Sequence, residues 1–154
     1  MNFRFSGISA APFRHLFALS DEDLAARDTS RWVAGPGDTL PCRVSLTDAA
    51  PGERLILTNY EHQPARSPYR STGPIFVREA AVEPYGGAEV PPVVRTRLVS
   101  LRAYDAAGMI LDADVVEGRV IEPVLERLFA NDDAAYLHIH NAKRGCFSCR
   151  VDRA

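Results

Sequence analysis

The residues best suited to chemistry lie near the end of the chain, in a pattern typical of a β-hairpin. Residues 136–140 alternate in polarity, a loop follows over residues 141–145, and residues 146–150 read as a return strand. Two of the four histidines and two of the three cysteines fall in this hairpin: His138, His140, Cys146 and Cys149. Because residues two apart on a strand share a face, His138 and His140 point the same way. The sequence therefore predicts a site in this hairpin.

The return strand is expected to continue the alternation. Its polar row then consists of Cys146, Ser148 and Arg150. Its apolar row consists of Phe147, Cys149 and Val151. Cys149 falls in the apolar row, so we assign it to the core. Cys146 remains a neighbour of the two histidines.

Three interpretations of the hairpin are open. In the first, His138, His140 and Cys146 bind a metal ion such as zinc and leave a fourth position free, which is the ligand number of a catalytic zinc. In the second, Cys146 is a catalytic nucleophile whose proton passes to His138 or His140. The nearby Arg144 would favour the thiolate, and Asn141 would orient the base. In the third, the histidines are ordinary sheet residues and Cys146 is a small buried filler.

A second group of polar side chains lies between residues 59 and 78. Its candidate ligand-binding residues are His62, Arg66, Tyr69, Arg70 and Arg78. Prolines and glycines interrupt this segment, so we expect a long loop. Guanidinium groups hold carboxylates and phosphates through paired hydrogen bonds, which predicts a small anionic molecule as the ligand. Alternatively, the arginines pair with Glu61, Glu79 and Glu83 and only hold the loop in place.

Local patterns predict the elements that position these residues. Strands are expected over residues 3–8, 42–46, 54–60, 75–78, 96–104 and 109–116, and in the terminal hairpin. Ser20, followed by three acidic residues, is expected to cap a short N-terminal helix. Apolar residues at helical spacing predict one amphipathic helix over residues 119–130. We therefore expect a single α+β domain, 1–154, with a mainly antiparallel sheet of about seven strands.

Composition restricts the partners and the compartment. A net charge of −2 gives no general attraction for nucleic acid. No apolar stretch approaches the roughly 20 residues of a spanning helix, so no membrane association is expected. Arg4, Arg14 and His15 interrupt the N-terminal apolar residues, so we expect no secretory signal. With an odd number of cysteines as well, we expect a soluble cytoplasmic protein with reduced thiols.

Two parts of the chain resemble an uncharacterised bacterial family. They are residues 41–79, above all the block from Asn59 to Glu79, and the terminal segment from His138 to Phe147. The family is known only as a domain of unknown function, family twelve-oh-three. It has no established activity, so the resemblance implies no substrate, cofactor or catalytic residue.

The two polar segments together predict a domain that binds a small anionic molecule in a cleft that both segments face. Arg66, Arg70 and Arg78 would be its clamps. The first alternative is a metal-dependent or Cys-dependent enzyme that uses the histidines and Cys146 of the hairpin. The second is a non-catalytic interaction module that forms a homodimer through an exposed sheet edge, which the terminal strand would offer.

Overall fold

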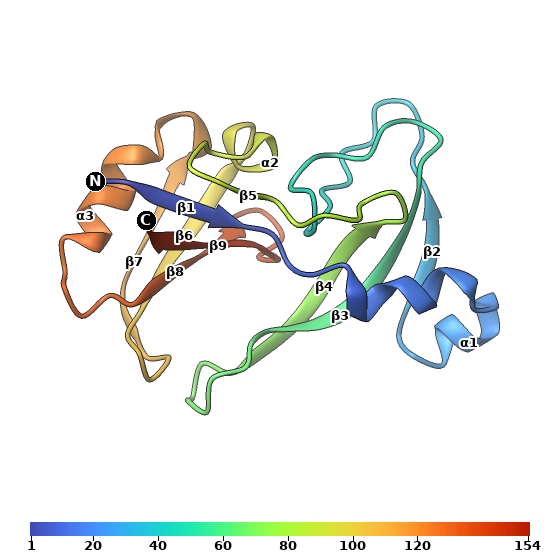
Figure 1. Ribbon diagram of the computed structural model, residues 1–154, viewed down its shortest axis with the longest axis horizontal. Helices are drawn as coiled ribbons and strands as arrows, with labels where there is room; N and C mark the ends of the chain where they lie inside the picture. Colours follow the sequence, from blue (N-terminus) through green and yellow to red (C-terminus); the bar gives the residue numbers. More distant parts are fainter.

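The computed structural model describes residues 1–154 and contains two antiparallel β-sheets (Figure 1). The larger sheet has six strands in the order β5-β1-β9-β8-β6-β7, and the smaller has three in the order β2-β3-β4. The larger sheet consists of β1 (Phe3–Ser6), β5 (Gly86–Gly87), β6 (Leu98–Tyr104), β7 (Ile110–Glu117), β8 (Tyr136–Asn141) and β9 (Phe147–Arg153). The smaller sheet consists of β2 (Ser30–Val33), β3 (Arg54–Gln63) and β4 (Ser71–Arg78). The predicted α+β class is confirmed, although β2 and β5 were not predicted.

Short helices connect the strands and cover them. They are the 3₁₀ helix η1 (Ala11–Ala18), α1 (Asp21–Ala25), α2 (Pro92–Arg95), the 3₁₀ turn η2 (Gly118–Val120) and α3 (Glu122–Phe129). The backbone N–H of Asp23 donates to the Ser20 hydroxyl at 3.1 Å, so Ser20 caps α1 as predicted. The helix expected over 119–130 consists of η2 and α3, and Pro123 lies in the first turn, where its missing N–H is harmless. None of the helices combines the length and the apolar character needed to cross a membrane.

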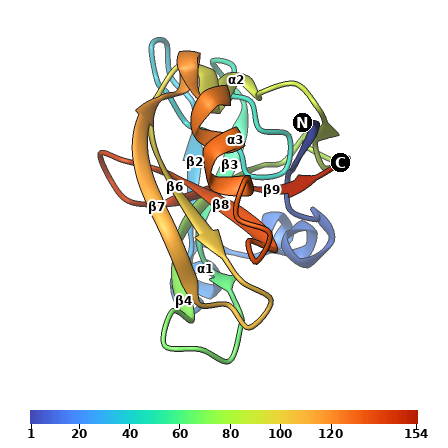
Figure 2. The same ribbon diagram turned by 90° about the vertical axis from the view of Figure 1, so that its left-hand side faces the viewer.

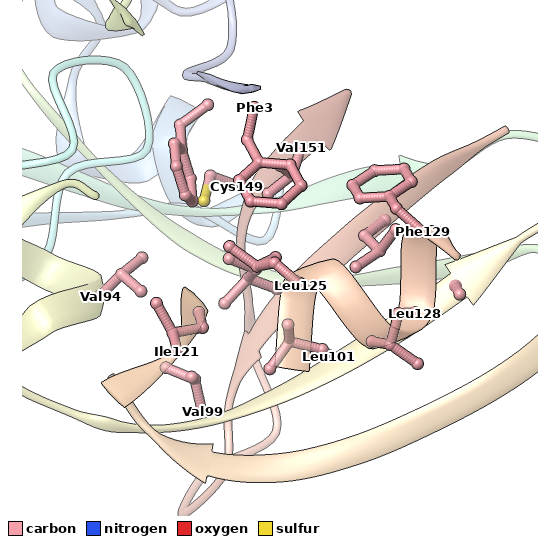
Figure 3. Close-up of a cluster of buried hydrophobic side chains, with 14 of the residues drawn as sticks. Phe3, Val94, Val99, Leu101, Ile121, Leu125, Leu128, Phe129, Cys149 and Val151 are labelled. Carbon is pink, nitrogen blue, oxygen red and sulfur yellow. The ribbon is translucent and has the colours of Figure 1, made fainter. Parts of the chain in front are cut away.

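The main hydrophobic core lies between α3 and one face of the larger sheet. Figure 1 shows the larger sheet between α3 and the smaller sheet, and Figure 2 shows α3 lying across its strands. Leu125 and Leu128 of α3 are buried there with Leu101 of β6 (Figure 3). Each such side chain contributes about 1.5–3 kcal/mol when it is removed from water. Cys149 and Val151 also belong to this core, as the alternation of the last strand predicted.

Residues 42–46 form a turn, not the predicted strand. The Leu46 N–H donates to the Cys42 carbonyl oxygen at 3.0 Å, and Leu46 has a φ of 53°. Strand pairing at this segment is limited to isolated bridges, one of which joins Cys42 to Phe76 of β4. The side chains of Cys42, Val44 and Leu46 are nevertheless fully buried. The apolar alternation therefore correctly indicated burial, but it did not indicate an extended backbone.

The long loop expected over residues 59–78 is mostly a β-hairpin. β3 continues through Gln63 and β4 begins at Ser71, so only residues 64–70 form the connection. Pro74 pairs with Asn59 inside β4. A proline fits there because β4 is an edge strand, which does not need all of its N–H groups for pairing. This extension of β3 carries His62 on a regular strand.

The terminal strand does not lie at a sheet edge. β9 pairs with β1 on one side and β8 on the other, so the prediction that it offers a free edge was wrong. The exposed long edge of the larger sheet belongs to β7, whose one partner is β6.

Two aspartates of β7 cover backbone groups of this edge strand. Asp112 accepts a hydrogen bond from the N–H of Ala113 at 2.7 Å, and Asp114 accepts one from Val115 at 2.8 Å. The second oxygen of each carboxylate pairs with Arg127 of α3, at 2.7 and 2.6 Å. N–H groups occupied in this way are not free to pair with another strand.

Candidate ligand-binding cleft

β8 sorts its side chains to the two faces of the larger sheet. Leu137 and Ile139 point into the core under α3. Tyr136, His138 and His140 point to the opposite face, where the smaller sheet lies. The prediction that both histidines share a face is confirmed.

The return strand β9 departs from simple alternation. Ile139 pairs with Cys149, but His140 pairs with Phe147, so Ser148 is an extra residue that forms a β-bulge. The bulge turns Phe147 onto the histidine face, where its ring centroid lies 5.1 Å from that of His138 and 5.8 Å from that of His140. The assignment of Phe147 to the apolar core row was therefore wrong, because one extra residue changes the face of the residues beyond it.

A third histidine reaches this place from the smaller sheet. The His62 ring, on β3, stacks on Phe147 with a centroid distance of 5.3 Å and an interplanar angle of 9°. Its centroid lies 5.0 Å from that of His140 and 6.3 Å from that of His138. Three of the four histidines of the chain thus meet between the sheets. We refer to His62, His138 and His140 as the histidine cluster.

The histidine cluster is buried, and its ring nitrogens form one hydrogen bond. The exposed fractions of His62, His138 and His140 are 9%, 4% and 1%. The one hydrogen bond joins His140 Nδ1 to the Gly145 carbonyl oxygen at 2.9 Å, and since a carbonyl only accepts, Nδ1 is the donor. Four other ring nitrogens have no partner: both nitrogens of His62, Nδ1 of His138 and Nε2 of His140. A buried polar group without a partner costs about 1–3 kcal/mol.

Burial keeps the three imidazoles uncharged. It lowers the pKa of His138 to about 3 and that of His140 to about 4, and it also lowers the pKa of His62. The positive charge of Arg102, on β6, lowers all three pKa values further. At neutral pH the histidine cluster therefore presents neutral hydrogen-bond donors and acceptors.

A cleft of about 500 Å³ opens beside the histidine cluster, where the end of β3 faces β8 and β9. It is lined by Ser6, Gly7, Ile8, Ser9, Tyr60, His62, Gln63, Pro64, Ala65, Tyr136, His138, Phe147 and Arg150. Clefts of this volume suit small organic molecules. His62, from the segment 59–78, thus shares the cleft with the terminal hairpin.

The polar groups of the cleft wall are held in fixed positions. The Arg150 guanidinium lies 4.1 Å above the centroid of the Tyr136 ring and pairs with Asp152 at 2.7 Å. The Gln63 amide donates to the Tyr136 hydroxyl at 3.0 Å. Arg150 is the one charged residue in the lining, which contains no aspartate or glutamate. The wall therefore combines aromatic faces, neutral imidazoles and one cation.

The predicted ligands of a metal ion are not arranged around a common point. No group of three or more His, Cys, Asp or Glu side chains is placed to hold a metal ion. The three imidazoles of the histidine cluster all pack against Phe147, whose ring occupies the space beside them. Cys146 contacts the Arg144 carbonyl oxygen, 3.9 Å from its Sγ. Zinc binding and thiol catalysis by this hairpin remain predictions without support from the geometry.

The arginines expected to clamp an anion do not converge. Arg70 pairs with Glu61 at 3.0 Å, whereas Arg78, at the other end of β4, pairs with Glu53. Arg66 is exposed in the connection between β3 and β4. None of these arginines lines the cleft. The contacts of Arg70 and Arg78 match the alternative that arginines hold the hairpin in place. Glu61 is a predicted partner and Glu53 is not, whereas Glu79 pairs with Arg54.

The other candidate residues also lie outside the lining of the cleft. Tyr69 packs edge-on against Tyr104, with 6.4 Å between the ring centroids. Asn141 closes the turn of the terminal hairpin through its N–H, which donates to the Cys146 carbonyl oxygen at 2.9 Å. Arg144 is exposed in that turn.

Four residues of the cleft were not predicted to belong to a site: Tyr60, Gln63, Tyr136 and Arg150. Tyr60 and His62 are two positions apart, which is the spacing of one strand face. That signal was hidden because the segment was interpreted as a loop. Arg150 stood in the predicted polar row, and its position beside Tyr136 depends on the register of β8 and β9.

A comparison with protein families matches residues 39–153 to the family described as "Protein of unknown function (DUF1203)". The chain belongs to this family. The resemblance noticed in the sequence is therefore confirmed. The matched region of this DUF1203 protein includes the whole histidine cluster and most of the cleft lining, with Ser6–Ser9 outside it. A search of curated proteins and a search of solved structures each find no match to the chain.

Proposed function

We propose that this DUF1203 protein binds a small planar molecule with a polar group in the cleft between its two sheets. The observation that carries the proposal is the set of three buried imidazole nitrogens without partners on His62 and His138, which line a cleft of about 500 Å³, with a fourth on the neighbouring His140. Leaving these nitrogens unpaired costs several kcal/mol by the usual magnitudes. A ligand that supplies the missing hydrogen bonds would recover part of this cost.

The shape and composition of the wall favour a planar ligand. Tyr60, Tyr136 and Phe147 add aromatic surface to the two imidazoles of the lining. Aromatic rings stack with one another or meet edge to face, with a gain of about 0.5–1.5 kcal/mol per pair beyond simple burial. The fixed Gln63–Tyr136 and Arg150–Asp152 contacts supply polar groups at defined positions, which orients a ligand.

Nuclear magnetic resonance with three probes of similar size tests the proposal. Benzamide, benzoate and benzylamine carry a neutral, an anionic and a cationic group on the same ring. At about 0.3 kcal/mol per heavy atom or somewhat more, such fragments bind with a Kd on the order of 1 mM or weaker. We expect at least one probe to shift the backbone amide signals of residues 6–9, 62–65 and 136–138. If none of the three probes shifts these signals at concentrations up to tens of millimolar, roughly ten times the expected Kd, the proposal is wrong.

A matched pair of histidine variants provides the control. His138→Phe keeps a flat ring in the wall but removes its nitrogens, so we expect the signal changes to weaken. His15→Phe alters the fourth histidine, which is exposed on η1 and lies outside the cleft. It should leave binding unchanged. Equal binding by both variants would show that the imidazole of the wall does not contact the probe.

A further inference from the structure

The charges around the histidine cluster are unbalanced. The groups that face it are Tyr60 from β3, Arg102 and Tyr104 from β6, Tyr136 from β8, Arg150 from β9 and Arg43 from the turn at residues 42–46. On β1, Arg4 lies opposite Asp152, and that aspartate pairs with Arg150 at the rim. Glu61, next to His62 along β3, pairs with Arg70. The nearby acids are thus already paired.

Two of the arginines have no acidic partner. Arg43 is 3% exposed, and its guanidinium donates to the carbonyl oxygens of Phe147 and Pro41, at 2.7 and 2.5 Å. Arg102 is half-buried, lies opposite His138 in the sheet and forms no ion pair. Every charged side chain that acts on the pKa values of the three histidines is an arginine or another histidine. Buried positive charges without counter-ions attract an anion.

The neutral imidazoles add a second property to this site. Burial opposes their protonation, and the arginines oppose it further. An anion in the cleft would oppose the effect of the arginines, because an opposite charge within about 4–6 Å favours the charged form of an imidazole. The proton would come from solvent and add to the free lone pair of a ring nitrogen, which for His140 is Nε2. The protonated ring could then donate to the anion without breaking any bond of the ligand.

We propose that the cleft selects planar molecules that carry a carboxylate, and that the histidine cluster takes up a proton when the carboxylate binds. The proposal rests on the proposed function, since it specifies the ligand of the same cleft. A carboxylate is favoured over a doubly charged group because Asp152 already neutralises Arg150 at the rim. One anion and one proton add no net charge to a buried place, which keeps the desolvation cost low.

Isothermal titration calorimetry tests both parts of the proposal. Benzoate and benzamide are titrated into the intact protein in buffers with different ionisation enthalpies, since the dependence of the heat on the buffer counts the protons taken up. We expect benzoate to bind about tenfold more tightly than benzamide, as one favourable charge interaction is worth about one pKa unit. We also expect proton uptake and affinity for benzoate to rise as the pH is lowered from about 6.5 to about 5, toward the lowered pKa values of the histidines.

Two variants identify the groups responsible. His138→Gln removes a titrating ring, so we expect weaker proton uptake with benzoate while benzamide still binds. Arg102 lies opposite His138 and does not line the cleft, so Arg102→Met should weaken benzoate binding but not benzamide binding. Arg66→Met, an exposed arginine outside the cleft, is the matched control and should bind both probes as the natural protein does.

The outcomes separate this inference from the proposed function. Binding of benzamide or benzylamine as tight as that of benzoate would overturn the selection of a carboxylate and leave the proposed function intact. Binding of benzoate without proton uptake at any pH would overturn the proton coupling alone. Absence of binding by every probe would overturn both proposals together.

Discussion

The two faces of the larger sheet come from the same strands but have opposite properties. Leu137 and Ile139 of β8 are fully buried in an apolar core, while His138 and His140 on the same strand are buried among groups that do not satisfy them. Four of the five buried side-chain polar atoms without a partner belong to the histidine cluster. The face under α3 thus supplies stability, and the face toward the smaller sheet retains unused hydrogen-bonding capacity. A ligand can bind only to polar groups that are still unpaired. The face toward the smaller sheet is therefore the one suited to ligand binding.

Acid should affect the histidine face most strongly. In the folded protein the pKa of His138 is about 3 and that of His140 about 4, against 6.5 for the solvent-exposed imidazole of the unfolded chain. Below about pH 6.5 the unfolded chain therefore binds protons that the folded protein does not, so the free energy of unfolding falls as the pH falls through this window. Above about pH 7.5, where the imidazoles are unprotonated in both states, the two histidines contribute no pH dependence. We expect a loss on the order of 5 kcal/mol between about pH 6.5 and pH 3.5.

Urea unfolding followed by circular dichroism at several pH values measures this loss. The upper part of the window is the most informative, because carboxylates such as Glu53, whose pKa is lowered by its hydrogen bonds with Arg78, titrate further down. His138→Leu should reduce the slope in that part of the window. An equally steep slope in this variant would assign the acid sensitivity to other groups.

Substitutions at two adjacent residues of β8 sharpen the contrast between the faces. Leu137→Ala leaves a cavity in the core under α3 and should cost about 2–5 kcal/mol of unfolding free energy. His138→Leu removes a nitrogen that has no partner, so we expect a change of about 1 kcal/mol or less, with either sign. Urea unfolding at neutral pH measures both. An equal loss of unfolding free energy in His138→Leu and Leu137→Ala would contradict this contrast. It would mean that the packing of the His138 ring stabilises the fold.

The arginines of the β3–β4 hairpin should show a smaller effect. The side chains of Arg78 and Glu53 are 20% and 22% exposed. Arg78 also donates hydrogen bonds to the hydroxyls of Ser45 and Thr47. We expect Arg78→Met to cost about 1–2 kcal/mol. Arg70 and Glu61 are more exposed, so Arg70→Met should change the stability by about 0.5 kcal/mol or less.

Thermal unfolding of the two arginine variants, together with the benzoate titration, distinguishes structure from ligand binding. Both variants should bind benzoate as the natural protein does, because neither arginine lines the cleft. Loss of benzoate binding in Arg70→Met without loss of stability would restore Arg70 as a ligand clamp.

Particular residues show what the sequence could reveal. The two-residue period placed His138 with His140 and put Cys149 in the core, because a strand fixes the face of each side chain locally. Phe147 was misplaced because a bulge depends on the register between two strands, which alternation within one strand does not show. Pro64, Pro68 and Pro74 suggested a long loop, yet Pro74 is compatible with an edge strand. Whether β4 is an edge strand is a property of the whole sheet.

The meeting of His62 with the terminal hairpin illustrates the same limit. These residues are separated by about half of the chain, and their contact depends on how the two sheets pack against each other. Local spacing carries no information about that packing. The sequence indicated that the arginines could form ion pairs, but it did not identify Glu53 as the partner of Arg78. The pairing of β3 with β4 brings these two residues together.

The cover on the edge of β7 is expected to depend on ionic strength. Asp112 and Asp114 cover N–H groups of the edge strand while Arg127 holds the two carboxylates in place, and both of these ion pairs are close to half exposed. Exposed ion pairs weaken as salt is added, because the Debye length falls from about 10 Å at 0.1 M to about 3 Å at 1 M. Concentrated salt would therefore loosen the cover on β7 and favour pairing between copies of the chain, whereas dilute buffer would keep the copies apart.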